Sequence, residues 1–412
     1  MNQMQKQLLY CLSAYRQGEQ SAKIVQNPGS LDFEEFYQLA FSQKLRAVAY
    51  DTLWRNPSFC TEKPELRERW KQETIRESIA QAVRSQKVIQ LCGQLKKAGV
   101  PYVLVKGLLC RELYRKPDLR ISGDEDLLIR RENTACCEKI LKEQGFELLQ
   151  NGENVDQWMD SCSGLHIELH TCMFSDRRAE YQKINAELEK EIMNPYTVAV
   201  SGGEIQSLQP TWHFLVLVLH ALKHFVHGGF GIRIISDILS YAECYKKEID
   251  REKADRILRQ VHGRIFLDQI FAIGEERLGF DREESGWMYS SVPDPEHLLE
   301  DCLDAGIYGT RTESRLHSSG MVSESVEGGR KNPRIGSSLF PSAKVLSGRY
   351  PVLKKAPVLL PACWICRIGS YLRHSFVGRQ KDNSPLQCLE TGRKRTEMMV
   401  QYGIIQENKE EN

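Results

Sequence analysis

A strand–turn–helix–strand segment in the first third of the chain constrains the fold more than any other part. It consists of an apolar strand over 102–105, a turn at Gly107, a helix over 108–114 and a second strand that carries Asp124 and Asp126. Side chains alternate between the faces of a strand, so these two aspartates point the same way, about 6–7 Å apart along the chain. Two carboxylates at this spacing can bind one or two Mg²⁺ ions.

A third acid follows on a later strand, over 165–170. Its apolar and polar residues alternate strictly: Leu165, Ile167 and Leu169 lie on one face, and His166, Glu168 and His170 lie on the other. This pattern is typical of a strand with one face on a core and the other on a cleft. We therefore expect Glu168 to face the same cleft as the two aspartates.

The order of these elements resembles the nucleotidyltransferase superfamily that includes polymerase β. It more closely resembles the bacterial nucleotidyltransferase family proteins of largely uncharacterised function. The matching segments cover roughly residues 65–375: 104–107, 120–129, Gly145-Phe146, 167–170, Leu219-His-x-x-x-His224, Arg233-x-x-x-Asp237 and 349–361. The resemblance implies an α/β (α+β) fold, in which a small mixed-sheet core is flanked by N-terminal and C-terminal helical regions.

The resemblance also implies a reaction. A nucleoside monophosphate would pass from ATP or another NTP to a hydroxyl-bearing acceptor, with two Mg²⁺ ions bound to Asp124, Asp126 and Glu168, the catalytic residues. The acceptor, a small molecule or a protein, stays open. The residues expected to bind the nucleotide are Lys106, Gly107, Arg120, Gly123, His170, His220, His224, Arg233 and Asp237.

Two residues depart from the superfamily pattern. Leu108 follows Gly107 where a serine usually contacts a phosphate, and Glu125 separates the two aspartates where an apolar residue is usual. A buried, unpaired glutamate would cost several kcal/mol, so we expect Glu125 to be paired or near an exposed edge. These departures favour an alternative, a catalytically weak or inactive protein that binds nucleotides or partners on the same fold.

Two further alternatives come from the histidines. The polar face of 165–170 could bind Zn²⁺ through His166, Glu168 and His170, which would suit a hydrolase. His220 and His224 lie on one face of a helix, where they could line the nucleotide site or simply pack between helices.

The hydrophobic patterning divides the chain into four regions. We expect an N-terminal helical region over 1–98, the α/β core over 99–205, a C-terminal helical region over 206–310, and a long loop with a C-terminal extension over 311–412. Within these regions, helices are predicted over 4–15, 33–54, 64–97, 212–225, 232–245, 251–278 and 363–376. The polar tail from Gln380 is expected to be partly disordered.

Composition limits the partners and the compartment. The 56 Lys and Arg residues nearly balance 55 Asp and Glu residues, so nucleic acid is not favoured as a partner. Residues 214–221 form the most apolar stretch, which is too short to cross a membrane. Thirteen cysteines without regular spacing, in a chain without a secretory signal, predict reduced thiols in the cytoplasm. The lone pair Cys363 and Cys366 only weakly indicates a metal or redox site.

Overall fold

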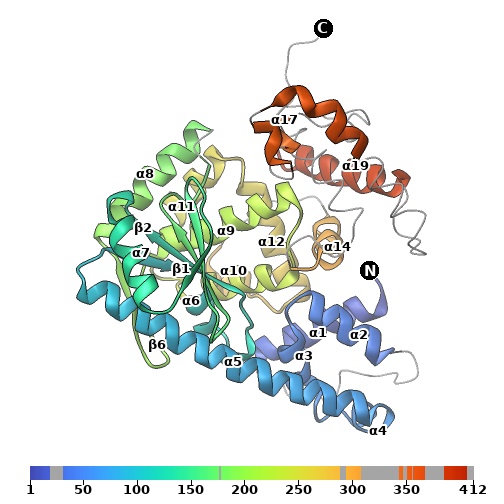
Figure 1. The fold of residues 1–412 in the computed structure, drawn as a ribbon. Helices are drawn as coiled ribbons and strands as arrows, with labels where there is room; N and C mark the ends of the chain where they lie inside the picture. The colour runs from blue at the N-terminus through green and yellow to red at the C-terminus, as the bar shows by residue number, and fades with distance from the viewer. Residues whose placement is uncertain are drawn as a thin grey trace. The chain divides into compact units, whose positions relative to one another are not determined.

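The structure is a computed structural model that describes residues 1–18, 31–175, 178–287, 294–307, 343–346, 350–354, 356–366 and 385–405 (Figure 1). The chain divides into two compact units. The first contains Met1–Leu219 and Ile235–Ser290, and the second contains His220–Ile234 and Ser291–Asn412. This division differs from the expected boundaries, because the helices around residue 220 and residue 234 each contribute to both units.

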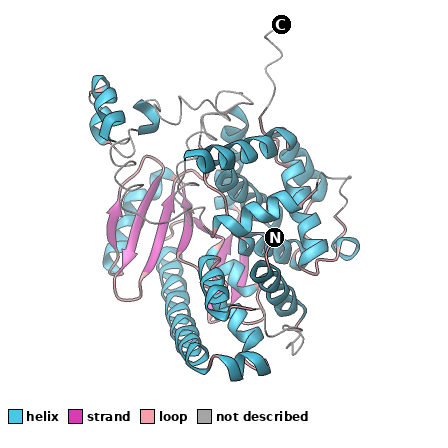
Figure 2. Ribbon diagram, turned by 90° about the vertical axis from the view of Figure 1, so that its right-hand side faces the viewer, coloured by secondary structure: helices cyan, strands magenta, loops and turns pink. Residues whose placement is uncertain are grey.

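The centre of the first unit is a five-stranded mixed sheet, drawn in magenta in Figure 2. Its strands, in spatial order, are β1 (Tyr102–Val105), β2 (Asp124–Ile129), β5 (Leu165–His170), β4 (Val155–Asp160) and β3 (Glu147–Gln150). β2 and β5 run parallel, and the other neighbours are antiparallel. The expected mixed-sheet α/β architecture is thereby confirmed.

Helices supply the apolar surfaces that the sheet needs. α6 (Gly107–Glu112) connects β1 to the short turn η2 (Pro117–Leu119), and α7 (Thr134–Glu143) follows η3 (Arg131–Asn133). α8 (Ala179–Met193) lies against β1 and β2. Its buried residues Ile184, Leu188 and Ile192 recur every four positions, which is the spacing of one helical face.

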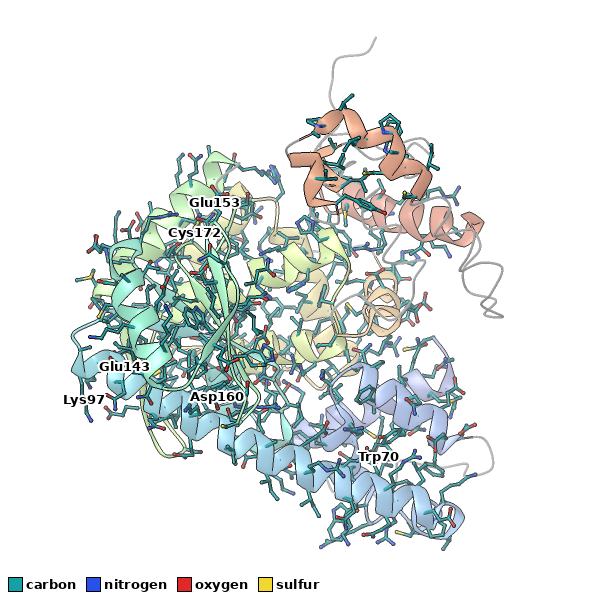
Figure 3. The ribbon with its side chains drawn as sticks, viewed as in Figure 1. Trp70, Lys97, Glu143, Glu153, Asp160 and Cys172 are labelled. Atoms are coloured by element: carbon teal, nitrogen blue, oxygen red, sulfur yellow. The ribbon has the colours of Figure 1, made fainter. Side chains whose placement is uncertain are left out.

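The N-terminal helices are α1 (Gln3–Gln17), α2 (Phe33–Ser42), α3 (Arg46–Leu53), α4 (Pro57–Glu62) and α5 (Pro64–Lys97). The single helix predicted over 33–54 is wrong, because Lys44 takes a left-handed conformation with φ +56° and separates α2 from α3. Trp70 of α5 is directed toward these helices (Figure 3) and contacts Phe36, Tyr37, Tyr50 and Phe59. This aromatic cluster attaches the N-terminal helices to α5.

After the sheet, the chain forms a hairpin and a series of helices. These elements are β6 (Tyr196–Val200), β7 (Gly203–Ser207), α9 (Pro210–His227), α10 (Ile232–Cys244), α11 (Arg251–Gln260), α12 (Arg264–Arg277) and α13 (Arg282–Ser285). The predicted helix over 251–278 is also interrupted, because His262 has φ +58° between α11 and α12.

The second unit includes α14 (Glu296–Ala305), α17 (Ala343–Leu346), η4 (Pro351–Lys354), η5 (Pro357–Leu359) and α19 (Pro385–Gln401). α19 is a regular helix within the polar tail for which composition predicts partial disorder. Arg395 of this helix donates a hydrogen bond to the Phe225 carbonyl. Most of the predicted long loop and C-terminal extension over 311–412, and most of the predicted helix over 363–376, lies outside the described residues. Cys363 packs with Leu346 and Leu353, while Cys366 is exposed. None of the described helices is long and apolar enough to cross a membrane.

Candidate active site

The register between the two parallel strands brings the predicted acids together. Asp124 lies opposite His166, and Asp126 lies opposite Glu168. Since the side-chain period of a strand is two residues, all four side chains emerge on the same face of the sheet. Asp124 is half-buried at the start of β2, and Asp126 is buried within the strand.

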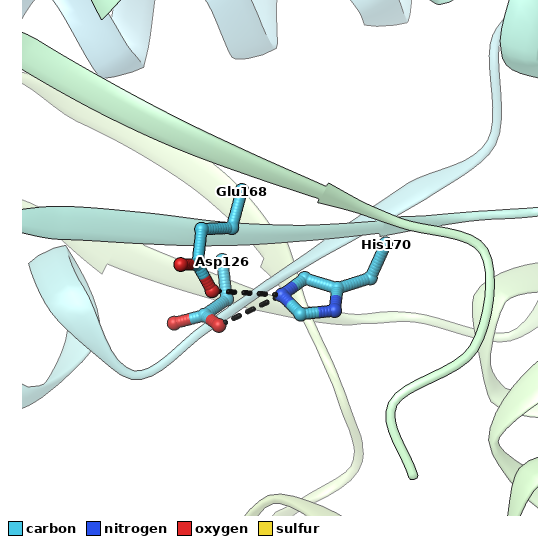
Figure 4. Close-up of side chains that lie close together, drawn as sticks. All are labelled: Asp126, Glu168 and His170. Atoms are coloured by element: carbon cyan, nitrogen blue, oxygen red, sulfur yellow. Dashed lines mark hydrogen bonds and ion pairs between the residues drawn. The ribbon is translucent and has the colours of Figure 1, made fainter. Parts of the chain in front are cut away.

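Asp126 is the centre of the cluster. Its Oδ1 lies 2.9 Å from Nε2 of His170, which is also 3.4 Å from Oε2 of Glu168 (Figure 4). Its Oδ2 lies 2.7 Å from Nζ of Lys106. Among the described residues, Asp126, Glu168 and His170 form a group whose potential metal ligands lie within 4.8 Å of one another. The structure therefore gathers Lys106, Asp126, Glu168 and His170, whereas His166 lies outside the metal-ligating group.

The charges in this cluster stabilise one another. Burial alone would lower the pKa of Lys106, but Asp126 and Asp124 raise it above its ordinary value. The pKa of Glu168 is lowered, chiefly by its hydrogen bond with His170. Burial disfavours the charged form of His170, yet its hydrogen bonds to Asp126 and Glu168 raise its pKa. In this cluster Lys106 and His170 thus compensate the negative charges of Asp126 and Glu168.

The backbone of Lys106 is held in an unusual conformation. Its φ of +61° and ψ of −127° belong to a region that favours glycine, so a lysine there is strained. The Lys106 N–H donates to Nε2 of the buried His213 at 3.1 Å. Because this nitrogen accepts, Nδ1 of His213 carries the proton and faces the Ser207 hydroxyl, which donates to the Leu104 carbonyl. Burial and the Lys106 charge lower the pKa of His213 to about 3, so the ring is neutral.

Glu125 points to the opposite face of β2 and is fully paired. Its Oε1 accepts from Arg111 at 2.6 Å, and its Oε2 accepts from the Leu108 N–H at 2.7 Å. The expectation that this glutamate is paired is therefore confirmed. The position of Glu125 also explains why residue 107 is a glycine, because a Cβ on that residue would lie 1.8 Å from Oε2 of Glu125. The Leu108 amide, in the first turn of α6, is thus bound to a carboxylate of the chain itself.

Arg120 and Asp237, both predicted nucleotide ligands, bind each other. The guanidinium donates to both carboxylate oxygens, at 2.8 and 2.6 Å, and to the Gly107 carbonyl at 3.2 Å. Tyr114 donates to the same carboxylate at 2.9 Å. All three residues are buried, so this cluster connects the turn around Gly107 to α10. Its geometry supports a positioning role.

Helix α5 fixes the loop that leads into β2. Gln81 accepts from the Ser122 N–H at 2.9 Å, and Arg84 donates to the Ser122 carbonyl at 3.5 Å. The Ser122 hydroxyl contacts Arg111. Gly123 lies in the bend that follows, directly before β2. The start of the Asp124 strand is thereby set by long-range contacts rather than by the loop sequence alone.

The remaining predicted ligands belong to the second unit. His220 and His224 contact each other through their Nε2 atoms at 2.7 Å, and Arg233 is buried. Nothing in these contacts assigns the three residues to the carboxylate cluster, and their proposed role in nucleotide binding stays a prediction.

A cleft of about 540 Å³ lies beyond the carboxyl ends of the two parallel strands. It is lined by β2 and the residues after it, by the segment that follows β5, and by α8. Cys172 belongs to this lining and marks that end of the sheet in Figure 3, with Asp160 at the other end. Ligands of open α/β sheets often bind beyond the carboxyl ends of the strands. Leu128, which lines the cleft, lies opposite His170 in the register.

Arg111 and His213 are two residues of this region that the sequence interpretation missed. Arg111 could have been predicted as the partner of Glu125, because a buried glutamate needs a cation and Arg111 lies about one helical turn after Leu108 in α6. His213 carries no such signal, because 107 residues separate it from Lys106.

Comparison with curated proteins gives no match. A crystal structure of an antigenic nucleotidyltransferase-like protein from Paracoccidioides brasiliensis is similar at 18% identity over 47% of this chain and 92% of that chain, with a TM-score of 0.31. The family model described as "Uncharacterised nucleotidyltransferase" matches residues 29–279. This match covers more than half of the chain, which therefore belongs to the family of uncharacterised nucleotidyltransferases.

Proposed function

We propose that the protein transfers a nucleoside monophosphate from an NTP, with ATP as the first candidate, to a hydroxyl group of an acceptor. The observation that carries this proposal is the row of acids on β2 and β5, which family membership associates with nucleotidyl transfer. In this reaction the acceptor oxygen attacks the α-phosphorus, the bond from that phosphorus to the bridging oxygen breaks, and pyrophosphate leaves.

The residues of the cluster fit the parts of such a site. A divalent cation on Asp126 and Glu168, with Asp124 beside them, would neutralise triphosphate charge and lower the pKa of the attacking hydroxyl. Glu168 is the most exposed member of the cluster, with 28% of its side chain accessible, and it would accept the proton of the acceptor. Lys106 would place its positive charge beside the phosphates. Its strained backbone conformation and the hydrogen bond from its N–H to His213 would hold it in position for this role.

The test is release of pyrophosphate from NTPs in the presence of Mg²⁺ or Mn²⁺, with candidate acceptors that include small alcohols and the protein itself. Asp126→Asn should abolish labelled product formation. Glu147→Gln is the matched control, because it removes an exposed acid of the same sheet on the edge strand β3. Identical product formation by wild type and Asp126→Asn would exclude the proposed mechanism.

An alternative function is supported by one specific contact. The Leu108 amide is already bound to Glu125, and the serine usual in the superfamily is replaced by leucine. A protein with this turn could bind nucleotides or a partner without turnover. Calorimetry separates the two proposals, since NTP binding that needs no metal and gives no pyrophosphate favours the binding protein.

A further inference from the structure

The cluster on β2 and β5 contains a nitrogen ligand where a set of carboxylates alone was expected. His170 is 95% buried, and its Nε2 faces both Asp126 and Glu168 rather than solvent. Its Nδ1 has no hydrogen-bond partner among the described residues, so the contacts at Nε2 are what orient the ring. The histidine is therefore aimed at the position between the two carboxylates.

The separations between these atoms match those of ligands around one ion. Two ligands about 2.1 Å from an ion are about 3.0 Å apart at a right angle and about 3.4 Å apart at a tetrahedral angle. The measured separations from Nε2 are 2.9 Å to Asp126 and 3.4 Å to Glu168. Lys106 binds the other oxygen of Asp126, so its ammonium leaves Oδ1 directed at the histidine.

We infer that His170 is a direct metal ligand, and that the ion bound by Asp126, Glu168 and His170 is a first-row transition metal such as Mn²⁺ rather than Mg²⁺. Mg²⁺ prefers oxygen ligands and retains its water, whereas an imidazole nitrogen beside two carboxylates suits first-row transition ions; among these Mn²⁺ is the one whose preference for carboxylates comes nearest to that of Mg²⁺. The inference rests on the proposed function in one respect, because nucleotidyl transfer needs an ion at this position. It adds which class of metal ion occupies the site.

The experiment uses the full chain and Mn²⁺ as the probe. Electron spin echo modulation of bound Mn²⁺ detects the nitrogen of a coordinated imidazole, and titration followed by electron paramagnetic resonance gives the affinity. Wild type should show the nitrogen coupling, and Mg²⁺ should displace Mn²⁺ only at large excess. His170→Gln should lose the coupling and bind Mn²⁺ roughly tenfold or more weakly, since even outer contacts of metal sites change affinity by this factor.

Two further variants make the test specific. His166→Gln is the matched control, because His166 lies on the same face of β5 four residues earlier and outside the ligand group; it should retain both coupling and affinity. His170→Asp creates a set of oxygen ligands, so it should bind metal without nitrogen coupling and discriminate less against Mg²⁺. This variant also shows whether a loss in His170→Gln reflects the ligand or a folding defect.

The outcomes separate this inference from the proposed function. Absence of nitrogen coupling in wild type, or its persistence in His170→Gln, overturns the inference. Nucleotidyl transfer with Mg²⁺ and no coupling would leave the function standing and the inference refuted. Nitrogen coupling without any transfer would support His170 as a ligand and refute the function.

Discussion

The buried pair between Arg111 and Glu125 allows a sharp prediction about stability. Arg111 is fully buried and Glu125 is 1% exposed, so water cannot solvate either charge when its partner is removed. Glu125→Gln keeps the size of the side chain and removes its charge. Removing one partner of a buried ion pair costs about 3–5 kcal/mol, because the remaining charge is left buried without compensation.

Glu125→Gln also disturbs the start of α6. If the amide oxygen keeps its bond to Arg111, the amide nitrogen cannot accept from the Leu108 N–H, and a buried unsatisfied donor costs about 1–3 kcal/mol. The two effects share one side chain and do not simply add, so we expect a total loss of about 3–5 kcal/mol. Since domains are typically stable by about 5–15 kcal/mol, this is a large fraction of the total.

Urea unfolding followed by circular dichroism measures this loss. Glu147→Gln, the same chemical change at an exposed position of the sheet, should alter the free energy of unfolding by less than about 0.5 kcal/mol. Arg111→Met should also destabilise strongly, and the double variant should lose much less than the sum of the two single losses. A loss below about 1 kcal/mol in Glu125→Gln, or additive losses in the double variant, would refute the argument.

Three further predictions follow from the same region. The pKa of His213 is lowered from 6.5 to about 3, so the unfolded chain binds the extra proton and stability falls as pH drops from about 6.5 toward 3, by up to about 1.4 kcal/mol per pH unit; urea unfolding should show this slope reduced in His213→Asn. Gly107→Ala should lower the melting temperature strongly, because φ is +26° and the new Cβ meets Glu125, whereas Gly93→Ala, in α5 with open space around it, should be neutral or stabilising. Mn²⁺ at about 100 times its dissociation constant should stabilise the fold by about 2.7 kcal/mol, and a chelator should reverse the thermal shift.

The sequence predicted those parts of the fold that depend on local periodicity. The apolar alternation on β5 identified which side chains share the face of the carboxylate cluster, and the spacing of Asp124 and Asp126 placed them on one face of β2. These predictions succeed because a strand has a fixed period of two residues. The same local rule could not find β4, whose buried positions are Asp156, Trp158 and Asp160 rather than three apolar residues.

Other features depend on contacts that local sequence does not contain. Asp160 is acceptable in the interior because Ser163 donates to it through both backbone and hydroxyl. The helix breaks at Lys44 and His262 use left-handed conformations in residues that carry no glycine signal. The pairing of Arg120 with Asp237 joins positions 117 residues apart, so no local pattern predicts it, and the role of both residues in nucleotide binding stays a prediction.

The register between β2 and β5 places Asp126 directly opposite Glu168, and like charges that face each other across neighbouring strands oppose sheet formation. The fold retains this pairing because Lys106 and His170 offset it, and the pKa of Glu168 is lowered although the Asp126 charge opposes that shift. Directed evolution for heat resistance alone would therefore be expected to keep Glu168 while His170 is present, and to replace Glu168 with a neutral residue where His170 is lost. The acid and the histidine would be retained or lost together.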